Sequence, residues 1–274
     1  MSFLVLAAAS LVPLVAVELA KAARWRVLLG RRRPSYAQCL RALVAGQLTN
    51  SLLPVRAGEA VSLGVLRAEG GGLVAGAAGL AGIKAIDSLV LAAIAGAVIG
   101  TAAAGRAGWS GATGAAALAL AAAVVLQRER FRRLLEGLPW ARQLRLAALA
   151  DVVDALHDRR TLVVALLTTL VAWGAGLVAN AAILAAVGIT PDLNLAARVI
   201  VAGYLVNVLP SPPAGLGVFE AGIAVALTTA GVPLPLAILA GVTLHVCQFV
   251  KLGLLLAASV VWSRWLRPVQ LRPA

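Results

Sequence analysis

The chain has 274 residues, of which 61% are hydrophobic and only 13% are charged, whereas soluble domains carry about a quarter charged residues. Its mean hydropathy is +0.95, and several apolar runs reach the roughly 18 to 20 residues that cross a bilayer. This composition excludes a soluble globular domain and predicts an all-α polytopic membrane protein. The net charge of +13 does not indicate a nucleic-acid partner, because the cations flank apolar segments as the positive-inside rule describes.

The first apolar segment is predicted over about residues 3–23. No basic residue precedes it, whereas Lys21, Arg24, Arg26 and residues 31–33 supply cations at or beyond its end. This order of charges argues against a cleaved signal peptide. It places the N-terminus outside and the end of the segment in the cytoplasm.

A polar phrase broken by proline comes next. The segment over residues 35–53 is apolar but carries Gln47 and Asn50, and it stops at Pro54. The following piece, over about 58–67, is only some 15 Å long at 1.5 Å per residue, which is half the hydrocarbon core. Two such pieces joined at a turn are predicted to form a re-entrant hairpin rather than two spans.

The middle of the chain contains further spans and the one substantial polar region. We predict a short helix and then a span over about 85–104, and another span over about 111–127. In residues 128–160, apolar side chains recur at helical spacing on both sides of Pro139, which predicts two amphipathic helices on the cytoplasmic membrane surface. A linker that covers the inner face is favoured there over a partner-docking site.

The second half repeats this plan. A span over 162–187 precedes a loop that has no basic residue before Arg198, and a long apolar stretch over 233–262 precedes an arginine-containing tail. The loop is therefore predicted outside and the C-terminus in the cytoplasm. The expected units are 1–127, 128–160 and 161–274. The preference for arginine over lysine suggests a bacterial genome rich in GC and hence a bacterial inner membrane.

An internal repeat relates the two halves. The stretches "RALVAGQLTN" from Arg41 and "RVIVAGYLVN" from Arg198 lie 157 positions apart and share six of ten residues. Beyond the following loop the offset is 161, which pairs residues 59 with 220 and 84 with 245. Because one phrase follows a cytoplasmic basic run and the other an uncharged outer loop, the halves are predicted to be inverted. Inverted repeats with two broken helices are typical of a transport site near the bilayer midplane.

Polar residues inside these segments are the candidate site. An ionised side chain at the bilayer centre costs about 2.5 to 3.5 kcal/mol on insertion scales and faces protein or a wet cavity. The candidates for substrate binding are Asn50, Arg56, Glu59, Lys84, Asp87, Asn207, Glu220 and His245.

Purely structural roles are also open for these residues. Glu59 and Glu220 follow glycines, where a carboxylate caps a new helix. The two asparagines would then only satisfy backbone groups. Lys84 and Asp87 are three residues apart and would pair with each other.

Four motifs carry a resemblance to a known family: "NSLLPVRAGE" over 50–59, "KAID" over 84–87, "PAGLGVFE" over 213–220 and "GVPLPLAILAGVTLHVCQF" over 231–249. The chain resembles the flippase-like family of lysylphosphatidylglycerol synthase transmembrane regions, which includes the lipid-flipping half of multiple peptide resistance factors. The resemblance implies lipid transport. The family pattern has glycine where Val55 and Ala214 stand, Glu-Arg at residues 83–84, and arginine where His245 stands. No soluble aminoacyl-transferase domain is visible.

Three functions remain open. The first is a translocator of a phospholipid or a polyprenyl-phosphate-linked lipid, in which cations and helix N-termini replace the water around an anionic headgroup. The second is an intramembrane enzyme with paired carboxylates, although two separate histidines and two cysteines without motif context offer no metal or nucleophile set. The third is a scaffold for a membrane synthase or glycosyltransferase. The first is favoured, with no catalytic residue, metal or cofactor expected.

Overall fold

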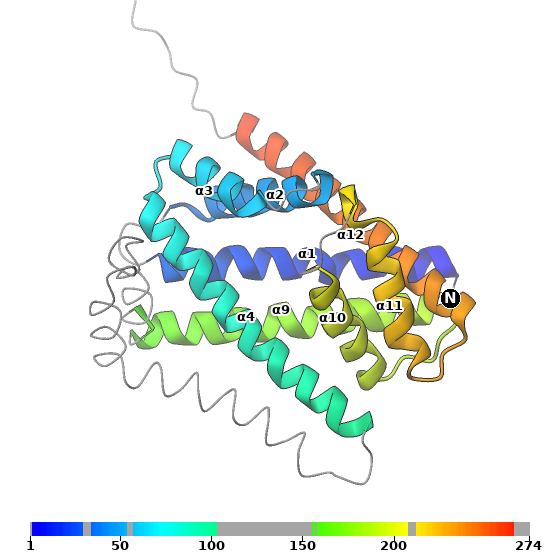
Figure 1. The fold of residues 1–274 in the computed structure, drawn as a ribbon. Coiled ribbons are helices and arrows are strands. Elements are labelled where there is room, and N and C mark those ends of the chain that lie inside the picture. The colour runs from blue at the N-terminus through cyan, green and yellow to red at the C-terminus, as the bar shows by residue number, and fades with distance from the viewer. Residues whose placement is uncertain are drawn as a thin grey trace, which may run out of the picture.

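The computed structural model describes residues 2–29, 34–53, 57–102, 155–156, 158–207 and 212–265. In these ranges every regular element is a helix (Figure 1). The first half contains α1 (Phe3–Leu28), α2 (Tyr36–Leu52), α3 (Gly58–Ala68) and α4 (Leu73–Ala102). The second half contains α9 (Arg159–Ala186), α10 (Leu193–Val206), the 3-10 turn η1 (Pro213–Gly215), α11 (Val218–Thr228) and α12 (Leu234–Trp265). The predicted span over 111–127 and most of the polar region 128–160 lie outside the described residues.

Four of these helices are long and apolar enough to cross a bilayer, namely α1, α4, α9 and α12. Their outer faces expose large aliphatic side chains, for example Leu4, Leu170 and Val246. In water such a continuous apolar surface would be unfavourable, whereas in a bilayer it contacts lipid. The prediction of an all-α membrane protein is therefore confirmed.

Two predicted boundaries are wrong. Helix α1 does not end near residue 23 but continues to Leu28, because Arg24 is buried and paired inside the protein instead of marking a solvated flank. Residues 73–102 do not form a short helix and a separate span. They form the single helix α4, since no proline interrupts the run and its glycines and polar residues are tolerated in a packed helix.

Helices α1 and α9 form a central antiparallel pair (Figure 1). Their contacts run in opposite order along the two helices. Leu14 shares a core cluster with Ala179, Ala20 shares one with Trp173, and Arg24 donates a hydrogen bond to Thr169. The first long helix of each half therefore runs opposite to the other.

The two helical hairpins, α2–α3 and α10–α11, make contacts at corresponding positions. A Cβ placed on Gly46 would lie 2.0 Å from the Ser62 hydroxyl and 2.5 Å from the carbonyl oxygen of Gly58. A Cβ on Gly203 would face Phe219 and Ile223 at 3.7 and 4.0 Å. Residues 219 and 223 follow residues 58 and 62 by 161 positions, which is the offset of the repeat.

The turn after each short helix is also the same. The Gly71 N–H donates to the Leu66 carbonyl at 2.8 Å, and the Val232 N–H donates to the Leu227 carbonyl at 3.1 Å. Each turn contains a glycine in the left-handed region that glycine favours: Gly70 has φ of 88° in the first turn and Gly231 has φ of 87° in the second. Both turns are therefore Schellman-type helix ends, and they direct α4 and α12 back along their hairpins.

The segment before α11 has an unusual backbone. In this proline-rich run Pro213–Gly215 forms a single 3-10 turn. Inside it Ala214 has φ of 64°, the one positive value at a non-glycine position among the described residues. The glycine that the family pattern has there would adopt this conformation without steric cost.

Candidate functional site

Two ion pairs occupy corresponding positions in the two halves. Lys84 of α4 bonds Glu59 of α3, with 2.6 Å between Nζ and Oε1. His245 of α12 contacts Glu220 of α11, with 2.6 Å between Nδ1 and Oε1. Each pair spans 25 residues of sequence and ties a short hairpin helix to the following long helix. The predicted repeat positions thus share one geometry.

The two pairs differ in exposure. The side chains of Glu59 and Lys84 are 40% and 57% exposed, whereas those of Glu220 and His245 are 17% and 11% exposed. The rings of Phe219 and Phe249 lie against the imidazole of His245, at centroid distances of 4.7 and 5.0 Å. One pair is therefore open to its surroundings and the other is enclosed.

Both carboxylates lie in the first turn of a helix. The second oxygen of Glu220 accepts the Gly217 N–H at 2.8 Å, which completes a capping arrangement at the start of α11. A negative charge at this position is favoured by the helix dipole. Glu220 therefore caps α11 through one carboxylate oxygen, as considered from the sequence, and contacts His245 through the other.

A buried polar cluster surrounds Glu18 of α1. None of its residues was among the predicted site residues. Glu18 Oε1 accepts from Lys251 of α12 at 2.9 Å and lies 3.9 Å from Lys21. Its Oε2 accepts from the Gln47 amide of α2. This cluster joins α1, α2 and α12 in the interior. A glutamate inside the apolar run "LVAVELAKA" was the available signal, but the sequence prediction used only the cations at the end of this segment.

A second buried cluster is centred on Arg24 and Asp87. The Arg24 guanidinium bonds Asp87 at 2.7 Å and donates to Thr169 at 2.9 Å. The Trp173 indole N–H also donates to Asp87, at 3.1 Å. The predicted Lys84–Asp87 pair is therefore wrong. Although the two residues are three positions apart on α4, Asp87 faces α1 and α9, whereas Lys84 faces α3.

These two clusters form one polar stripe, because Glu18, Lys21 and Arg24 follow at three-residue intervals along α1 and so lie near one face. In their usual ionisation states the three cations Lys21, Arg24 and Lys251 face two carboxylates, Glu18 and Asp87, leaving one net positive charge. Within the membrane such a stripe attracts an anion.

The remaining predicted site residues have simpler roles. Asn50 Oδ1 accepts the Gly58 N–H at 2.7 Å, so it ties α2 to the start of α3. The Asn207 amide donates to the Gly203 carbonyl of its own helix at 2.7 Å. For both asparagines the structural role is the one observed. Arg56 lies outside the described residues.

The site offers no visible catalytic set within the part of the chain that is described. There Glu59 bonds Lys84 and Glu220 contacts His245, and no hydrogen bond links the two pairs. The same residues contain no group of three histidine, cysteine or acidic side chains that could hold a metal ion. Chemically, this arrangement can exchange ion-pair partners and bind an anionic group.

Four apolar helices long enough to span a bilayer, with ion pairs at their interior, define an integral membrane protein with a polar core. The sequence model of one family, described as the lysylphosphatidylglycerol synthase TM region, matches residues 1–257. The chain belongs to this family, as its motifs indicated. No curated protein and no solved structure matches this chain. The family supports a role connected with membrane lipids.

Proposed function

We propose that the protein is a lipid translocator, not an enzyme, which moves a lipid with an anionic headgroup between the leaflets of a bacterial inner membrane. The observation that supports this most is the pair of equivalent contacts, Glu59–Lys84 and Glu220–His245, each at 2.6 Å. They lie in halves whose first long helices are antiparallel. An inverted repeat with two re-entrant hairpins accounts for both facts and is a common architecture for alternating access.

The unequal exposure of the two pairs fits this mechanism. In an alternating-access cycle two equivalent gates are not open at once, so an open Glu59–Lys84 pair and an enclosed Glu220–His245 pair would represent one end state. In the opposite state their exposures would exchange. Each carboxylate would then release its cation to the headgroup phosphate and take it back afterwards.

The buried stripe would assist the headgroup between the two gates. A phosphate cannot enter hydrocarbon unescorted, because removing water from a charge is very unfavourable. The stripe around Glu18 and Arg24 has one net positive charge, and Lys21 at its edge is partly accessible. The acyl chains would remain in the surrounding lipid while the headgroup passes along this stripe.

The test is lipid movement in liposomes that contain the purified full-length protein. Wild type is compared with Glu59→Gln and Glu220→Gln, using labelled anionic, zwitterionic and polyprenyl-phosphate lipids, with and without a pH gradient. We expect selective movement of an anionic lipid, lost at least about tenfold in each variant because its cation no longer has a charged partner. Glu69→Gln is the matched control, since Glu69 pairs with Arg41 at the α3–α4 turn.

Two results would contradict the proposal. Full transport in both glutamine variants would show that the ion pairs do not act in translocation. Chemical conversion of the lipids, detected by mass spectrometry after incubation, would instead indicate an intramembrane enzyme.

A further inference from the structure

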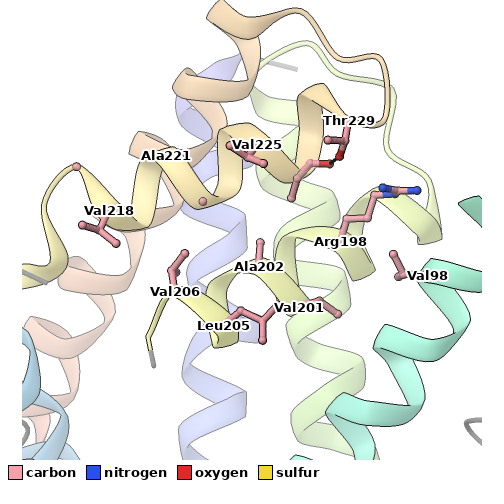
Figure 2. A pocket seen from close by; sticks show the side chains of 13 residues that line it. Val98, Arg198, Val201, Ala202, Leu205, Val206, Val218, Ala221, Val225 and Thr229 are labelled. Carbon is pink, nitrogen blue, oxygen red and sulfur yellow. Dashed lines mark hydrogen bonds between the residues drawn. The ribbon is translucent and has the colours of Figure 1, made fainter. Parts of the chain in front are cut away.

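An open groove lies between α10 and α11 on the second hairpin. Its volume is about 670 Å³, and Figure 2 shows its lining side chains. The walls are aliphatic along most of the length, with Val201, Leu205 and Val206 on α10 and Val218, Ala221 and Val225 on α11. Such aliphatic walls have the character of a site for a hydrocarbon chain rather than for a polar solute.

One end of the groove is different. Arg198 of α10 is the one charged residue in its lining as far as the chain is described, and Thr229 lies at the same end, near Val98 of α4 (Figure 2). Val206 and Val218 line the opposite end. The groove is therefore amphipathic along its length, with a cation and a hydroxyl at one end and an aliphatic channel leading away from them.

Arg198 differs from its counterpart in the first half. The equivalent residue, Arg41, makes two hydrogen bonds to the carboxylate of Glu69, at 2.8 and 2.9 Å, and these bonds raise the pKa of Arg41. Position 230, which corresponds to Glu69 at the offset of 161, is alanine. Arg198 bonds the neutral Asn194 at 2.6 Å, and within the described residues no carboxylate forms a salt bridge with it. The second half thus has no counterpart of Glu69, the acid that pairs with Arg41 in the first half.

We propose that this groove binds one acyl chain of an anionic phospholipid and that Arg198 binds the headgroup phosphate. The planar guanidinium matches the oxygens of a phosphate and retains donors beyond the one used by Asn194. The aliphatic walls of α10 and α11 cover the chain, and Thr229 supplies a hydroxyl near the phosphate. On the first hairpin Glu69 already occupies the equivalent arginine, Arg41, so the same phosphate site is not expected there.

This inference goes beyond translocation, since a protein that held the lipid without moving it would have the same groove. Binding is therefore measured without transport, by native mass spectrometry of the full chain in detergent. The probes are phosphatidylglycerol and phosphatidylcholine with identical acyl chains. We expect wild type to retain phosphatidylglycerol about tenfold better, because both lipids offer a phosphate to Arg198 but the choline cation of phosphatidylcholine already neutralises that phosphate.

Three variants locate the site. Arg198→Gln should remove most of the preference for phosphatidylglycerol, whereas Arg41→Gln, which changes the net charge equally at the matched position, should leave it. Ala230→Glu restores the missing acid beside an intact Arg198 and should lower the preference as Arg198→Gln does. Ala221→Phe fills the exposed groove wall and should weaken the retention of both lipids.

Equal losses in Arg198→Gln and Arg41→Gln would overturn the proposal, because they would show attraction by overall charge. Unchanged binding in Ala230→Glu and Ala221→Phe would also overturn it, because the lipid would then lie elsewhere. The thermal midpoint of each variant in detergent confirms that the compared proteins are folded. Since Glu59 and Glu220 are unaltered in all these variants, the result is separable from that of the transport experiment.

Discussion

Arg24 shows at the residue scale how a charge is kept inside this protein. Its side chain is completely buried, and its Nε has no hydrogen-bond partner among the described residues. Asp87 and Thr169 bind its other nitrogens. Breaking a buried pair by removing one partner is far costlier than removing both, because the remaining charge has no solvent.

We therefore expect Asp87→Leu to destabilise the protein by about 3 to 5 kcal/mol, and the double variant Arg24→Met/Asp87→Leu to recover a large part of that loss. The measurement is thermal unfolding in detergent. Glu69→Leu is the control, and its partly exposed pair with Arg41 should contribute less than about 1 kcal/mol. A double variant as unstable as the single one would show that packing, not charge, makes the Arg24 position sensitive.

Ala214 is the residue with the clearest backbone strain. Its φ of 64° lies in the left-handed region, which costs a residue with a Cβ roughly 1 kcal/mol. Ala214→Gly should raise the unfolding midpoint by an amount equivalent to at most about 1 kcal/mol, reduced by the greater freedom of glycine in the unfolded chain.

The neighbouring Gly217, with φ of 81°, provides the opposite test. Gly217→Ala places a Cβ at a positive φ, as in Ala214. It should lower the unfolding midpoint by an amount equivalent to about 1 to 2 kcal/mol in the free energy of unfolding. If both substitutions shifted the midpoint in the same direction, backbone conformation would not be the cause.

At the scale of elements, the close approach of α2 and α3 at Gly46 sets the first hairpin. Gly46→Ala would bring a methyl group to 2.0 Å from Ser62 Oγ and 2.5 Å from the backbone oxygen of Gly58. The backbone cannot yield cheaply, so we expect a loss of about 1 to 3 kcal/mol and lower transport in the liposome assay.

Gly64, on α3, is the matched control for this prediction. No atom lies within 4 Å of a Cβ placed there, so Gly64→Ala should instead stabilise the helix by about 0.5 to 1 kcal/mol. Equal stability of the Gly46→Ala and Gly64→Ala proteins would show that the hairpin does not depend on helix contact at Gly46.

At the scale of the whole molecule, the proposed inversion places equivalent turns on opposite membrane faces. Residues 72 and 233, related by the offset of 161, are both exposed and directly precede α4 and α12. With Cys39 and Cys247, which are buried, replaced by alanine, single cysteines are introduced as Gly72→Cys and Pro233→Cys. We expect a membrane-impermeant maleimide to label the Pro233 variant from outside and the Gly72 variant only after the cytoplasmic face is opened. Labelling of both from one side would exclude an inverted repeat.

Much of this architecture was predictable because membrane solvation acts directly on composition. Long apolar runs must form helices in lipid, where backbone groups have no other partners, so the class and the positions of α9 and α12 follow from the sequence. The repeat was visible because its glycines, asparagines and acids serve close approach, capping and pairing at equal spacing. The same spacing marked Glu59 and Lys84 as the counterparts of Glu220 and His245, although it did not show that the members of each set would pair.

What the tertiary structure alone decided is which charge meets which. Lys84 and Asp87 are neighbours on one helix, yet they bond residues of different helices. Lys21 and Arg24 resembled the cytoplasmic end of a span until their partners on α1, α4 and α9 were known. Arg198, which bonds a neutral asparagine, and Arg41, which bonds a carboxylate, are indistinguishable in the repeated phrase. The sequence by itself determined that the chain lies in a membrane, where its helices form and that its two halves repeat, because these properties depend on local composition and spacing. The pairing of charges depends on helix packing between residues that are 25 to 233 positions apart, and no local pattern encodes it.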